Sequence, residues 1–168
     1  MGSTLSSETT AAAAGAVGRV RRDPMAMLPF IGYNAGDYLN HWDSISERGN
    51  AEQLPQVFLV NWFRRDSEGG FAWPGFSENS RVLKWVVERI EGKAEAKDTP
   101  IGLIPAPGSL DVSGLNMSDD QLAEATHVDV DEWRAELPGI EEWYANFGDA
   151  LPASLRAELD ALTERLDG

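Results

Sequence analysis

The chain has 168 residues, carries 14 Lys and Arg against 28 Asp and Glu, and contains no cysteine. This length is that of about one domain, and a hydrophobic content of 42% supports a modest folded core. The formal net charge of −14 argues against nucleic acid and an anionic membrane surface as partners, because both attract basic side chains. The absence of cysteine excludes disulfides, thiolate nucleophiles and cysteine-ligated zinc.

The acidic residues are concentrated in the C-terminal part of the chain. Residues 1–100 hold 11 basic and 13 acidic side chains, whereas residues 101–168 hold 3 basic and 15 acidic ones. We therefore expect any contact with phosphate groups in the first hundred residues. No apolar run approaches the roughly 18 residues of a membrane-spanning helix, and we expect a cytoplasmic protein.

Few regular elements are predicted in the first part of the chain. Residues 1–22 are small and polar, with little side-chain surface to bury. Residues 56–62 are β-branched and aromatic, which predicts a buried strand, and residues 71–73 follow a glycine turn as a short return strand. A short helix is predicted over residues 37–46, with four apolar residues on one side: Tyr38, Leu39, Trp42 and Ile45.

The rest of the chain is predicted to be mainly helical. Ser77 is suited to cap a helix that ends near Glu91, with an apolar face made of Val82, Leu83, Val86, Val87 and Ile90. Residues 92–116 contain three prolines and are predicted to be irregular. Further helices are predicted over 118–125, 130–147 and 152–166. The last two carry apolar stripes typical of a core: Trp133, Leu137, Ile140, Trp143, Tyr144, Phe147, Leu155, Leu159, Leu162 and Leu166.

The common catalytic and metal-binding motifs are missing from the sequence. The two histidines, His41 and His127, have no partner at ligand spacing, so no metal site is predicted. There is no G-x-x-x-x-G-K-S/T phosphate loop and no G-x-S-x-G nucleophile elbow. The residues alone therefore indicate no catalytic site.

An aromatic segment carries the most information. Six aromatic residues occur within 19 positions, set among Gly, Pro and Asn: Phe58, Trp62, Phe63, Phe71, Trp73 and Phe76. Aromatic side chains on loops can form a slot for a flat ligand, and stacking is worth about 1–3 kcal/mol per base. Asn79 falls in the first turn of the next helix, where its amide can recognise the polar edge of guanine. The basic side chains of Arg64 and Arg65 are suited to bind the phosphate groups of such a ligand.

Two other interpretations of this segment remain open on composition alone. The aromatic side chains can form a small core beneath a hairpin, with the arginines on its surface. They can also form a surface on which a sugar stacks.

The run from Asn61 to Leu83, NWFRRDSEGGFAWPGFSENSRVL, resembles the guanine-binding segment of GTP-dependent phosphoenolpyruvate carboxykinases. The family pattern N-W-F-R-x-x-x-x-G-x-F-x-W-P-G-F-G-E-N-S-R-V-L differs from it at Ser77, which replaces a glycine. The stretch SSETTAAAAG…RRDPMAMLPFIGYNAGDYLNHW resembles the family's mobile lid and the segment behind it. The later TPIGLIP and the acidic helical tail fit the family's C-terminus, so the resemblance covers essentially all 168 residues.

The resemblance implies a function and a set of ligands. Family members convert oxaloacetate and GTP to phosphoenolpyruvate, CO2 and GDP, a step of gluconeogenesis, with Mn2+ or Mg2+. Their phosphate loop, metal ligands and substrate-binding arginines lie upstream of the segment that this chain resembles. We therefore expect a C-terminal fragment that is monomeric and inactive alone, with no catalytic residue and no metal ligand of its own.

The resemblance also assigns roles to particular residues. The residues matched to the guanine nucleotide site are Trp62, Phe63, Phe71, Phe76, Ser77, Glu78 and Asn79. Those matched to the lid, which excludes water from a reactive enolate, are Thr9, Thr10, Ala11, Ala12 and Ala13. A Ser77 hydroxyl can cap the helix, so we expect binding to survive that change. Ser6 and Ala14 replace an Arg and a Glu that are common in the family near the lid, which affects its anchoring.

The expected fold class is α/β, as part of the carboxykinase C-terminal nucleotide-binding domain. It divides into a lid region (1–22), a guanine-binding hairpin and helix (56–91) and an acidic helical tail (118–168). Two other functions remain open: a non-catalytic module that binds guanine nucleotides, and a structural fragment whose aromatic residues are only core.

Overall fold

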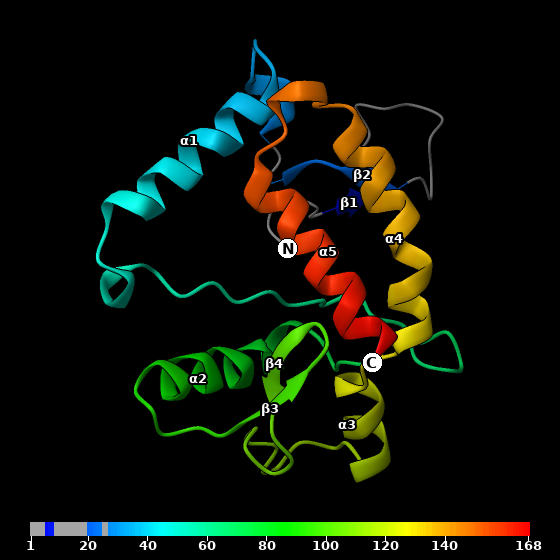
Figure 1. Ribbon diagram of the computed structural model, residues 1–168. Helices are drawn as coiled ribbons and strands as arrows, with labels where there is room; N and C mark the ends of the chain where they lie inside the picture. Colours follow the sequence, from blue (N-terminus) through cyan, green and yellow to red (C-terminus); the bar gives the residue numbers. More distant parts are fainter. Residues whose placement is uncertain (1–5, 9–19, 25–26) are drawn as a thin grey trace. The chain divides into compact units, whose positions relative to one another are not determined.

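The computed structural model describes residues 6–8, 20–24 and 27–168, which divide into two compact units (Figure 1). The first unit is drawn from Met1–Leu54 and Asp131–Gly168, and the second is Pro55–Val130. Both units combine helices with a two-stranded antiparallel sheet, so the predicted α/β class is confirmed. No helix of the described residues is long and apolar enough to cross a membrane.

Three helices build the first unit: α1 (Ala35–Arg48), α4 (Val130–Ala145) and α5 (Ala153–Asp167). Strands β1 (Ser6–Glu8) and β2 (Val20–Arg22) pair in it, and it also contains the short 3-10 helices η3 (Leu28–Phe30), η4 (Ala51–Gln53) and η6 (Gly148–Ala150). The core contains most of the predicted stripes of α4 and α5, packed against Leu39 of α1, whereas Trp133 and Leu166 are not part of this cluster. Its buried members are Leu39, Ile140, Tyr144, Phe147 and Leu159.

The start of α1 is fixed by polar and steric contacts with the segment that follows α4. Asn34 caps the helix, since its Oδ1 accepts from the backbone N–H of Gly36 at 2.8 Å and its Nδ2 donates to the carbonyl of Phe147 at 3.1 Å. Gly36 is required here because a Cβ at this position would lie 2.4 Å from the carbonyl oxygen of Ala150. The helix predicted over residues 37–46 is thus confirmed. It begins two residues earlier and ends two residues later than predicted.

The second unit is built around α2 (Asn79–Ile90). The 3-10 helix η5 (Phe76–Glu78) precedes it, and a hairpin of β3 (Ala96–Thr99) and β4 (Gly102–Pro105) follows, with α3 (Asp119–Thr126) after that. Ser118 caps α3 in a reciprocal capping box with Gln121. The buried members of the core are Trp73, Trp85, Ala94 and Leu110.

Two predictions about strands are wrong. Residues 56–62 form no strand, and Val57, Leu59 and Val60 are exposed. A strand needs a neighbour to accept and donate ladder hydrogen bonds, and no described residue pairs with this segment. The return strand at 71–73 is reduced to one bridge between Arg65 and Phe71. Residues 92–116, in contrast, contain the β3–β4 hairpin where an irregular segment was predicted.

The helix after the aromatic segment differs from its prediction at its start and on one face. Ser77 does not cap it, because the residue at that position belongs to η5 and its hydroxyl donates to Glu78 Oε1 at 3.4 Å. The side of α2 that packs on the core is centred on Trp85, with Val82 and Val86 beside it. The other three apolar residues of the predicted face are exposed: Leu83, Val87 and Ile90.

Candidate functional site

A tight turn holds the first aromatic pair in place. Asp66 Oδ1 accepts from the backbone N–H groups of Glu68 at 3.0 Å and Gly70 at 2.7 Å, and Gly69 adopts a φ of +84° that favours glycine. This turn returns the chain so that the rings of Phe63 and Phe71 meet at 6.3 Å between centroids, edge to face.

The structure separates the six aromatic residues into two groups. Trp73 is buried, and Phe58 and Trp62 pack against the core around it. The other three are exposed, at 75% for Phe63, 53% for Phe71 and 93% for Phe76. A small core explains the first group only, because side chains this exposed bury too little surface to stabilise the fold.

The exposed Phe76 follows an unusual backbone conformation before α2. Gly75 adopts a φ of +110°, which an L side chain rarely adopts, and η5 follows at once. Asn79 then occupies the first position of α2, in the first turn as predicted.

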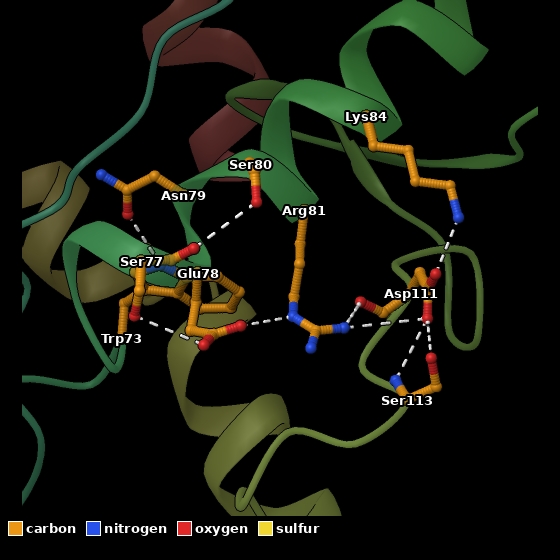
Figure 2. A network of polar contacts seen from close by, with 9 residues as sticks. All are labelled: Trp73, Ser77, Glu78, Asn79, Ser80, Arg81, Lys84, Asp111 and Ser113. Carbon is orange, nitrogen blue, oxygen red and sulfur yellow. Dashed lines mark hydrogen bonds and ion pairs between the residues drawn. The ribbon is translucent and has the colours of Figure 1, made fainter.

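Asn79 is oriented by a neighbouring indole. The Nε1–H group of Trp73 donates to Oδ1 of Asn79 at 3.0 Å, and Figure 2 shows the amide nitrogen of Asn79 on the side away from Trp73. Trp73 is 7% exposed, and Asn79 is half-buried. The Asn79 amide therefore offers an N–H donor, three residues after the exposed Phe76.

An ionic network lies on the next turn of α2 (Figure 2). Arg81 Nε donates to Glu78 Oε2 at 2.6 Å, and its Nη1 donates to the carbonyl of Asp111 at 3.0 Å. The Asp111 carboxylate accepts from Lys84 Nζ at 2.7 Å and from the hydroxyl of Ser113 at 2.6 Å. This network ties Glu78 and α2 to the loop after β4.

The network also shifts three pKa values. The hydrogen bond from Arg81 lowers the pKa of Glu78. The hydrogen bonds from Lys84 and Ser113 hold the pKa of Asp111 well below its usual range, and the hydrogen bond to Asp111 raises the pKa of Lys84. The two carboxylates are therefore charged at neutral pH and cannot act as proton donors there.

The two arginines considered for phosphate binding have local partners. Arg64 Nη1 donates to the carbonyl of His127. Arg65 Nη1 donates to the carbonyl of Gly69 at 3.2 Å, and its guanidinium lies 4.0 Å from the centroid of the Phe71 ring. Arg64 thus ties the aromatic segment to the residue that follows α3, and Arg65 stabilises the turn that contains Gly69.

The residues expected to form the lid lie outside the described residues: Thr9, Thr10, Ala11, Ala12 and Ala13. Across residues 6–8, 20–24 and 27–168, no group of three or more His, Cys, Asp or Glu side chains could hold a metal ion. Sequence reasoning missed the contact of Trp73 with Asn79 and the role of Asp111. The spacing of Glu78 and Arg81, three apart, was a readable signal for one pair of the network.

The chain matches a known domain family over nearly its whole length. The family model for the C-terminal P-loop domain of phosphoenolpyruvate carboxykinase matches residues 1–165. The chain belongs to this family. The resemblance noted from the aromatic segment is thereby confirmed over nearly the whole chain.

Curated relatives agree with this assignment. Proteins named phosphoenolpyruvate carboxykinase (GTP) from Paenarthrobacter aurescens and Arthrobacter sp. are 66% and 67% identical to the chain over 166 residues. One of the same name from Neocallimastix frontalis is 51% identical over 167 residues. Each alignment covers 99% of this chain but 27% of the relative, so the chain spans about a quarter of its relatives' length.

Proposed function

We propose that this chain supplies the guanine-binding part of a GTP-dependent phosphoenolpyruvate carboxykinase. The whole enzyme would convert oxaloacetate and GTP to phosphoenolpyruvate, CO2 and GDP. The observation that carries the proposal is a set of exposed aromatic side chains, Phe63, Phe71 and Phe76, in the same chain segment as an Asn79 amide that offers an N–H donor. A planar base with an acceptor oxygen matches both features.

Each residue has a proposed part in binding. The exposed rings stack on the base, Trp62 supports them from the core, and Asn79 donates to the guanine oxygen. The 3-10 turn from Phe76 to Glu78 sets the position of Asn79, with Ser77 at its exposed surface. Glu78 acts through its ion pair with Arg81, which fixes the start of α2.

We further propose the functional division expected from the sequence. Residues 1–22 form the lid region, residues 56–91 the guanine-binding hairpin and helix, and residues 118–168 the acidic helical tail. The lid residues Thr9 to Ala13 close over the active site of the whole enzyme and exclude water from the enolate, which protects it from protonation.

The metal ion belongs to the proposal for the whole enzyme. Mn2+ or Mg2+ would neutralise charge on the transferred phosphoryl group. The residues described here do not fit such an ion. We therefore propose that the phosphate loop, the metal ligands and the substrate-binding arginines belong to the part of the family chain that these residues do not represent. We also propose a monomeric, cytoplasmic protein.

Titration of the chain with GDP, GTP and ADP tests the proposal. Tryptophan emission is a suitable readout, because Trp73 contacts Asn79 and Trp62 packs against the same core. We expect weak saturable binding of the guanine nucleotides, and weaker binding of ADP. If GDP and ADP leave the emission equally unchanged, the exposed rings are not a nucleotide site and the structural alternative is favoured.

A further inference from the structure

The orientation of the Asn79 amide follows from the chemistry of its neighbour. An indole N–H is a donor and never an acceptor. The 3.0 Å contact between Trp73 Nε1 and Asn79 is therefore a hydrogen bond only when the amide oxygen faces the indole. The opposite orientation would place the NH2 group of Asn79 against another donor.

Burial makes that opposite orientation costly. Trp73 is 7% exposed, so water has little access to its ring and cannot readily replace a lost acceptor. A buried donor without an acceptor is destabilising. One orientation of the Asn79 side chain is thus selected before any ligand arrives.

We propose that Trp73 is a positioning residue that sets base selectivity by holding the Asn79 amide with its NH2 group toward the ligand. This inference rests on the proposed guanine site. Guanine and hypoxanthine present an acceptor at O6, whereas adenine presents a donor amino group at that position. A fixed NH2 group favours the first two and opposes the third, while a freely rotating amide accommodates all three.

Substitution of Trp73→Phe keeps an aromatic ring in the core and removes the N–H group. The core offers a matched control in Trp85, which is 5% exposed and donates through Nε1 to the hydroxyl of Ser109 at 3.0 Å. Trp85→Phe removes the same group from the same cluster without touching Asn79. Dissociation constants for GDP, inosine diphosphate and ADP are measured for the 168-residue chain and both variants by NMR titration, which is suited to weak binding.

We expect the Trp85→Phe variant to prefer GDP and inosine diphosphate over ADP as strongly as wild type does. In Trp73→Phe both preferences should fall by about threefold to tenfold, the value of one hydrogen bond. An unchanged preference in Trp73→Phe overturns the inference, as does an equal loss in both variants, which reveals a general effect on the fold. A wild-type chain that binds GDP and ADP alike contradicts the proposed function itself.

A measurement on wild type covers the case in which Trp73→Phe does not fold. The nuclear Overhauser effect between the indole N–H proton of Trp73 and the side-chain amide protons of Asn79 reports which end of the amide faces the ring. We expect a weak effect, because the oxygen lies between them. A strong effect places the nitrogen against the indole and overturns the inference.

Discussion

Truncation of Phe76 separates a ligand-binding ring from a core ring. Phe76 is 93% exposed, so folding removes only about 7% of its surface from water. For an aromatic side chain of roughly 200 Å2, at about 25 cal/mol per Å2, the burial is worth about 0.4 kcal/mol. Phe76→Ala should therefore lower the free energy of unfolding by no more than about 0.5 kcal/mol. Truncation of a buried aromatic ring costs about 3–5 kcal/mol.

The same substitution should have a much larger effect on ligand binding. Loss of one stacked ring costs about 1–3 kcal/mol per base, which is a decrease in GDP affinity of roughly fivefold to 150-fold. Urea unfolding gives the first quantity and NMR titration with GDP the second. Phe30→Ala is the matched control, because Phe30 is likewise highly exposed, at 81%, but lies in the other unit. A loss of stability above about 2 kcal/mol, or unchanged GDP affinity, would refute the reasoning.

Three further predictions concern activity, pH and packing. The purified 168-residue chain should not turn over oxaloacetate with GTP and Mn2+, and measurable release of phosphoenolpyruvate contradicts this. The lowered pKa of Asp111 means that its ionised form stabilises the fold above the unfolded value of about 3.9, and that this contribution is lost as the pH falls toward the folded value. Asp111→Asn should therefore lower the urea midpoint at pH 7, and its difference from wild type should shrink below about pH 4; a difference independent of pH excludes the ion pair with Lys84 as the cause. Gly36→Val should lower the free energy of unfolding by at least about 1–3 kcal/mol, because its Cβ meets the backbone of Ala150. Gly32→Ala, where a Cβ meets nothing within 4 Å, should change it little, and equal effects of the two substitutions refute this steric account.

The sequence by itself determined the helices and the family. The apolar stripes of α4 and α5 repeat at the helical period, and their ends were predicted within about two residues because periodicity and helix-stopping residues are local signals. The segment from Asn61 to Leu83 carries the family resemblance for a related reason. Many residues in a fixed order define it, so no three-dimensional information is needed to recognise it.

Tertiary structure alone decided which aromatic residues are buried in the core and which are exposed. Trp73 and Phe76 lie three residues apart in the same aromatic run, yet one is buried and the other is 93% exposed. The difference depends on Trp85 and Leu110, which pack with Trp73 from further along the chain. Local composition cannot encode such contacts, because burial is set by residues distant in sequence. For the same reason the segment at 56–62 was wrongly predicted as a buried strand. Its β propensity can be read from the sequence, whereas the absence of a pairing strand among the described residues cannot.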